Sequence, residues 1–223
     1  MTGWGQNMNS SFRRRVAYGG LVFFVLVLAA VVISPSEPSS NATAAKVFAT
    51  YHKHRTEWAV NGFIIEAAVI VGLFYFWYLR DYISRITAGT SLATIGYAGV
   101  VVFAISGTVG AGVHITIADA AGDGNVSASV IQTLNLLNND FNLIMNGAGA
   151  ATFLLATGIA VLRYHALPRW LGWVAVVFGV ISLTGIPGPA GPGLWVLLAS
   201  ITMLVSQDAV PVTGEAATPA AVS

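Results

Sequence analysis

Few side chains in this sequence could do chemistry inside an apolar environment, and Glu66 is the clearest of them. It lies seven residues into the apolar run 59–79, which puts it about 10 Å deep on a helix. A carboxylate near the bilayer centre costs about 2.5–3.5 kcal/mol, so it must be protonated, paired or exposed to water. Asn146 lies at the same depth in the run 139–162. Ser106 and Thr108 lie a few residues below the outer end of the run 88–112, so we expect Glu66, Asn146, Ser106 and Thr108 to share one polar layer.

Other polar residues are expected around this layer. Asn135, Asn138, Asn142 and Asn146 repeat at 3-4-4 spacing, which predicts a polar stripe along one helix face. The candidate ligand-binding residues are Glu66, Asn146, Asn142, His114, Asp140 and Asn61. The hypothesis is a polar vestibule with Glu66 at its floor. The alternative is that these groups only join helices through hydrogen bonds, which contribute about 0.6 kcal/mol each on average.

The histidines do not predict a metal site. His52 and His54 are two residues apart and would point in nearly opposite directions on a helix, whereas helical ligand pairs are three or four apart. The chain has no cysteine, which excludes disulfides, thiolate zinc sites and iron–sulfur clusters. No nucleotide-binding or nucleophile-elbow motif is found. We therefore expect no metal and no cofactor.

The composition predicts that these residues lie in a membrane protein. Hydrophobic residues make up 56% of the chain and charged residues only 9%, against about 25% charged in soluble domains. The lipid bilayer is therefore the expected partner. The net charge of +1 provides no basic surface for nucleic acid.

Six apolar runs predict an all-α bundle of six transmembrane helices. They cover 16–34, 59–79, 88–112, 139–162, 170–186 and 191–206. The last two are short for a span of about 20 residues, and the Pro- and Gly-rich segment 187–193 separates them. We expect a helical hairpin there, and one kinked or re-entrant span over 170–206 is the alternative.

Lysine and arginine positions predict that both termini are cytoplasmic in a multi-pass protein of the cell membrane. Seven basic residues fall on the inner side with this topology, namely Arg13, Arg14, Arg15, Arg80, Arg85, Arg163 and Arg169. Three fall outside, namely Lys46, Lys53 and Arg55. The first run is longer than the apolar core of a signal peptide, so we expect it to remain as a span. Residues 1–206 then form one transmembrane domain, and 207–223 a disordered cytoplasmic tail.

Two stretches predict outer amphipathic helices and a duplicated helical-hairpin unit. Residues 41–62 and 126–147 each begin with polar residues and end in Asn-Gly at the start of a span. In the second stretch Val130, Leu134, Leu137 and Phe141 share one expected apolar face. Two such units would be parallel repeats, and chance similarity is the alternative.

The layout resembles a bacterial family of six-helix membrane proteins known as the domain of unknown function four-three-eight-six. The similarity lies in the basic start and first span at 13–32, the Asn-Ala-Thr-Ala segment at 41–44, and Leu-Pro-Arg-Trp-Leu-Gly-Trp at 167–173. It covers about residues 12–206. The resemblance implies a six-helix fold and no particular activity.

Three functions follow from these residues. The first is binding or passing a small ligand through an outward-facing polar cavity. The second is a structural or assembly subunit that docks on a membrane protein partner. The third is an intramembrane enzyme using Glu66 and His114, which needs a second catalytic group within about 3 Å of one of them. The sequence favours a protein that is not an enzyme.

Overall fold

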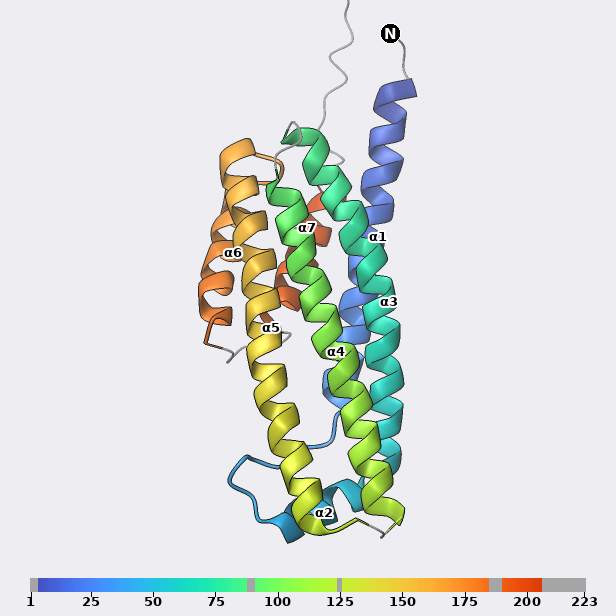
Figure 1. The fold of residues 1–223 in the computed structure, drawn as a ribbon. Helices are drawn as coiled ribbons and strands as arrows, with labels where there is room; N and C mark the ends of the chain where they lie inside the picture. Colours follow the sequence, from blue (N-terminus) through green and yellow to red (C-terminus); the bar gives the residue numbers. More distant parts are fainter. Residues whose placement is uncertain (1–3, 88–90, 124–125, 185–189, 206–223) are drawn as a thin grey trace, which may run out of the picture.

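The computed structural model describes residues 4–87, 91–123, 126–184 and 190–205, and these form helices without strands. The seven helices in these ranges are α1 (Trp4–Ile33), α2 (Ala44–Lys53), α3 (Arg55–Ile86), α4 (Leu92–Asp123), α5 (Ala128–Tyr164), α6 (Arg169–Ser182) and α7 (Ala190–Val205). The expected all-α architecture is confirmed (Figure 1). The predicted tail at 207–223 lies outside the described residues.

Four helices are long and apolar enough to cross a membrane. They are Arg14–Ile33 within α1, and the whole of α3, α4 and α5. Helices α6 and α7 are apolar but have only 14 and 16 residues. At about 1.5 Å per residue they extend about 21 and 24 Å, less than the roughly 30 Å of a hydrocarbon core.

Residues 170–206 contain two helices rather than one kinked helix. Helix α6 ends at Ser182 and α7 begins at Ala190. Pro192 lies in the first turn of α7, where a proline removes no helical hydrogen bond. The indole nitrogen of Trp195 donates to the Leu171 carbonyl at 3.0 Å and joins the two helices.

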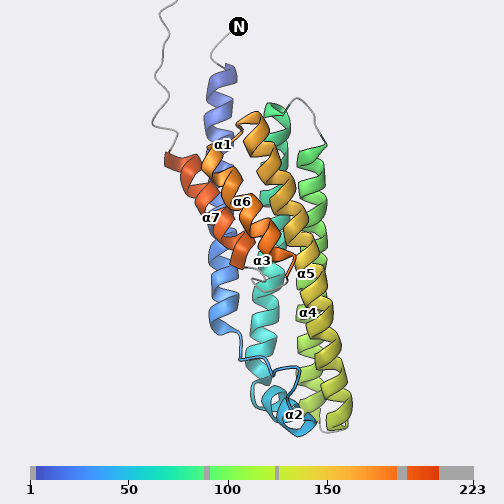
Figure 2. The same cartoon turned by 90° about the vertical axis from the view of Figure 1, so that its left-hand side faces the viewer.

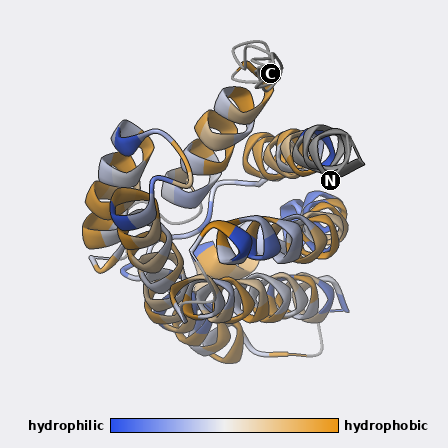
Figure 3. Cartoon of the chain, turned by 90° about the horizontal axis from the view of Figure 1, so that it is seen from above, coloured by the Kyte–Doolittle hydropathy of each residue, from blue (hydrophilic) through white to orange (hydrophobic). Residues whose placement is uncertain are grey.

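The helices other than α2 form a ring. Helix α1 packs on α3, α3 on α4, α4 on α5, α5 on α6, α6 on α7, and α7 returns to α1 (Figure 3). The start of α1 and the end of α7 lie at the same end of this ring, and α2 lies across the opposite end (Figures 1 and 2). We call that opposite end the α2 end.

Only one of the two expected amphipathic helices is a separate element. Helix α2 is separated from α3 at His54, whose backbone is not helical (φ −108°, ψ 28°). Residues 128–147 are instead the first part of α5, which continues without a break to Tyr164. The two stretches therefore differ in structure, and a duplicated unit stays a prediction.

The residues of the expected apolar face of α5 are not all turned toward the bundle, although Leu134 packs against its apolar cluster. Val130 and Leu137 are 47% and 65% exposed, whereas Asn135 and Asn138 are buried. At the α2 end this helix therefore turns its amides inward together with Ile131, and Val130 and Leu137 outward. That arrangement suits a helix with lipid on its outer side, because buried amides can find partners only inside the bundle.

Two apolar clusters lie at different levels of the ring. At the α2 end, Tyr51 of α2 packs with Trp58, Ile117 and Ile131. The larger cluster joins α1, α3, α4, α5, α6 and α7, and Phe76, Phe153 and Trp195 pack edge to face within it.

Candidate functional site

A cavity of about 400 Å³ lies between α1, α3, α4 and α5. Most of its wall is aliphatic, aromatic or glycine. Its six polar lining residues are Ser34, Glu37, Asn61, His114, Asn142 and Asn146. A volume of this size is within the range of small-molecule sites.

The cavity is polar at the α2 end and apolar at the other. Along α3 its wall extends from Asn61 to Phe76, fifteen residues or about 22 Å. The antiparallel α4 lines it from His114, opposite Asn61, to Val100, opposite Phe76. It is therefore a long, narrow space with most of its polar groups gathered at one end.

The hairpin of α6 and α7 does not line this cavity. Helix α7 begins at the level of Val27, because a Cβ added to Gly193 would lie 3.8 Å from the Val27 side chain. Ala30, Val31 and Ser34 lie further toward the α2 end. There, α3 is visible between α1 and α5 below the hairpin (Figure 2). The polar half of the cavity thus has no cover from α6 or α7.

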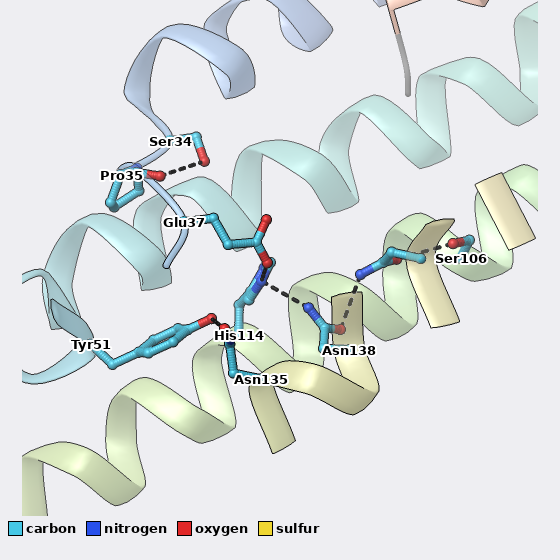
Figure 4. A network of polar contacts seen from close by, with 9 residues as sticks. Ser34, Pro35, Glu37, Tyr51, Ser106, His114, Asn135 and Asn138 are labelled. Atoms are coloured by element: carbon cyan, nitrogen blue, oxygen red, sulfur yellow. Dashed lines mark hydrogen bonds and ion pairs between the residues drawn. The ribbon is translucent and has the colours of Figure 1, made fainter. Parts of the chain in front are cut away.

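His114 is the centre of the polar end. Its Nε2 lies 3.0 Å from Glu37 Oε1 and 2.8 Å from Asn138 Nδ2. Its ring packs on Trp58 with centroids 4.5 Å apart, and Tyr51 lies 6.1 Å away. The imidazole is thereby fixed between the segment after α1 and the amides of α5 (Figure 4).

A chain of amides continues from His114 into the bundle (Figure 4). Asn142 Nδ2 donates to Asn138 Oδ1 at 3.0 Å, and Ser106 Oγ donates to Asn142 Oδ1 at 3.0 Å. Asn138 and Ser106 are almost completely buried, so these bonds satisfy groups that water does not reach. We call Ser106, Asn142 and Asn138 the amide chain.

Which atoms donate and which accept along the amide chain depends on whether His114 Nε2 carries a proton. If His114 Nε2 is unprotonated, its single lone pair accepts from Asn138 and Nε2 has no proton to donate to Glu37. If Nε2 donates to Glu37, the Asn138 amide must turn its oxygen toward the ring, and Asn142 must follow. The Glu37–His114 pair and the amide orientations are therefore coupled.

Tyr51 connects α2 to the same region. Its hydroxyl donates to Asn135 Oδ1 at 2.8 Å, and both side chains are buried. Burial raises the pKa of the Tyr51 phenol well above its ordinary value, and the nearby Glu37 carboxylate raises it further. Tyr51 is therefore a neutral hydrogen-bond donor that fixes α2 to α5.

The structure does not place Glu66 at the floor of the vestibule. Glu66 is outside the cavity lining, and its Oε2 accepts a long hydrogen bond from Thr108 Oγ1 at 3.5 Å on the exposed side of α3 and α4. The reason is angular: Glu66 is five residues from Asn61, or about 140° around the helix. The expected pairing of Glu66 with Asn146 or His114 is therefore not formed.

The other predicted residues separate into two groups. Asn61, His114, Asn142 and Asn146 all line the cavity, as expected from their shared depth. Asn61 Nδ2 donates to the Ala30 carbonyl. Asp140 is exposed on α5 and does not line the cavity.

Glu37 is the functional residue that the sequence did not reveal. It lies in the connection between α1 and α2, outside any apolar run, and nothing in its local pattern differs from a solvated loop residue. Only the path of the chain across α4 brings it to His114.

Within the described ranges, no three His, Asp or Glu side chains gather closely enough to hold a metal ion. Comparison with known proteins found no matching family model, no similar curated protein and no similar solved structure. The resemblance of residues 12–206 to the six-helix family therefore stays a prediction.

Proposed function

We propose that this protein binds a small amphiphilic molecule, with its apolar chain along α3 and α4 and its polar head at the α2 end. The observation that supports this most directly is the polarity of the cavity. Its polar lining residues other than Asn146 gather around His114, and apolar side chains line most of the remaining length toward Phe76 and Val100.

The dimensions are consistent with a single chain. A cavity about 22 Å long along α3 exceeds half of a hydrocarbon core of about 30 Å, so it can hold a chain as long as one leaflet is deep. With a volume of about 400 Å³ it is narrow for its length. Entry from the surrounding leaflet is supported by the lack of cover from α6 and α7 over the polar half.

We also propose that the α2 end faces outward and that both termini are cytoplasmic in the cell membrane. The basic residues of the connections at the opposite end support this orientation. The conclusion about the termini holds whether α6 and α7 cross fully, giving six spans, or only enter the membrane and return. In either case the chain leaves on the side where α6 began.

The binding proposal can be tested with a monoglyceride carrying one dodecyl-length chain. Purified protein in phosphatidylcholine nanodiscs should retain one such molecule, detected by native mass spectrometry. Ala104→Phe places a phenyl ring where a nearly buried alanine lines the cavity, and it should abolish this binding. Ile105→Phe, at the neighbouring side chain that is 48% exposed, should retain it. Equal retention by both variants would refute the proposed site.

A further inference from the structure

We infer that the polar end of the cavity selects a positively charged amine head, with the Glu37 carboxylate as its counter-ion. This inference rests on the proposed amphiphile site and identifies the class of head group.

The charge of the lining is the first argument. Glu37 is the only formally charged side chain among the lining residues of the described cavity, and none is Lys or Arg. Arg55, at the same end of the bundle, lies 2.9 Å from Asp119 and 3.8 Å from Asp123, and it does not line the cavity. An anionic head would therefore meet the Glu37 carboxylate with no lysine or arginine in the lining to compensate it.

Glu37 has hydrogen-bonding capacity to spare. Its side chain is 43% exposed, and Oε1 of its carboxylate holds the contact with His114. An ionised carboxylate offers about four lone-pair positions, so the second oxygen is available to a ligand. The Glu37–His114 contact borders the cavity, so this second oxygen is accessible to a ligand.

The neighbouring amides supply acceptors. The side-chain NH₂ group of Asn61 donates to the Ala30 carbonyl, so its side-chain oxygen remains available to accept a hydrogen bond from a ligand. Asn146 lines the cavity and has no hydrogen-bond partner among the described residues. Asn142 already accepts from Ser106 through Oδ1 and donates to Asn138 through Nδ2. Asn146 lies about 12 Å along α5 from Asn138, so the head group at Glu37 meets the Glu37 carboxylate and the Asn61 oxygen. A protonated primary amine carries three donors, which these acceptors can share.

The ligand class is therefore a long-chain primary amine. An alcohol of the same chain length would fill the apolar part equally well and lose only the charge-assisted hydrogen bond. A carboxylate of that length would add repulsion from Glu37.

Three probes with one chain length separate these contributions: dodecylamine, dodecanol and dodecanoate. Binding to the full-length protein in zwitterionic nanodiscs is measured by equilibrium dialysis with labelled probes, and empty nanodiscs are subtracted. We expect the amine to bind at least about tenfold more tightly than the alcohol, the scale of a hydrogen bond to a charged group, and the carboxylate to bind most weakly. Dodecanoate binding as well as dodecylamine would overturn the inference.

Variants assign the preference to Glu37. Glu37→Gln should remove the amine's advantage over dodecanol, measured as the ratio of the two affinities within that variant, and Glu37→Lys should reverse the ranking toward dodecanoate. Asp140→Asn removes an exposed carboxylate outside the cavity and should retain the wild-type ranking. An unchanged amine-to-alcohol ratio in Glu37→Gln would overturn the inference even if dodecanol binds. Failure of all three probes to bind would instead overturn the proposed function.

Discussion

The imidazole Nε2 of His114 lies 3.0 Å from the Glu37 carboxylate, although 77 positions separate the two residues. This contact joins the segment after α1 to α4 at the level where α6 and α7 no longer lie between α1 and α5. It therefore connects the ring at its open end and also forms the polar end of the cavity. Stability and ligand binding are linked at this one pair.

The amide chain should contribute to stability through Asn138. Asn138→Ala removes a buried partner from both His114 and Asn142, and an unsatisfied buried group costs about 1–3 kcal/mol. The neighbouring Asn139→Ala is the control, because Asn139 takes part in no hydrogen bond among the described residues. Thermal unfolding in nanodiscs should show a lower Tm for Asn138→Ala alone, at roughly 2–4 °C per kcal/mol. Equal midpoints would show that the chain is not a stabilising network.

Close packing of α4 on α5 depends on Gly99. A Cβ at this position would lie 2.5 Å from the Phe153 backbone nitrogen and 2.8 Å from the Gly149 carbonyl oxygen. Neither backbone atom can move aside cheaply, so Gly99→Ala should destabilise the protein by about 1–3 kcal/mol. Gly112→Ala, on the same helix, meets nothing within 4 Å and should be neutral. Thermal unfolding of the two variants side by side is the measurement, and a neutral Gly99→Ala would contradict the close approach.

The sequence predicts the long helices and the amide stripe well, because both depend on periodicity within one element. Hydropathy indicates α1, α3, α4 and α5, and the 3-4-4 spacing places Asn135, Asn138 and Asn142 on one face of α5. The close contact of Gly99 with Gly149 joins two helices, and the periodicity of either helix alone does not indicate it.

The remaining site depends on information that is not local. Glu66 and Asn146 share a depth, but depth does not fix the direction of a side chain around its helix, and direction determines which side chains line a cavity. Glu37 could not be found in this way, because a residue in a connection has no helical period. Its position follows from how residues 34–43 cross the α2 end, which depends on the packing of α2 against α4 and α5.

The proposed orientation can be measured directly, because the chain contains no cysteine. Ser91→Cys and Ser129→Cys place single exposed thiols before α4 and at the start of α5, at opposite ends of the bundle. In intact cells a membrane-impermeant maleimide should label Ser129→Cys and not Ser91→Cys. Permeabilised cells should label both, which controls for accessibility. Labelling of Ser91→Cys alone in intact cells would invert the topology.

Tyr51 should make stability fall in alkali. Burial raises the pKa of its phenol, so the folded protein keeps a proton that the unfolded chain releases above about pH 10. The stabilisation is complete below pH 10 and declines as the pH rises beyond it.

Tyr51→Phe should be less stable at pH 8, because Asn135 loses its partner, and its stability should decline less between about pH 9 and 11.5. Tyr18→Phe, at a side chain 58% exposed, should retain the wild-type decline in unfolding midpoints against pH. A Tyr51→Phe curve parallel to wild type would contradict this assignment.

Glu66 should be dispensable for binding. Its carboxylate lies outside the cavity lining and contacts only Thr108 among the described residues, at a distance of 3.5 Å. Glu66→Gln keeps the shape and the hydrogen-bond acceptor, so retention of dodecanol and dodecylamine in nanodiscs should match wild type. Replacing a carboxylate beside the apolar surface of α3 and α4 should also raise the Tm slightly, because a charge that faces lipid is costly. Asn146→Leu, inside the lining, should weaken dodecylamine binding under the same conditions. If Glu66→Gln lost binding and Asn146→Leu retained it, the ligand site would lie beside Glu66, on the outer side of α3 and α4.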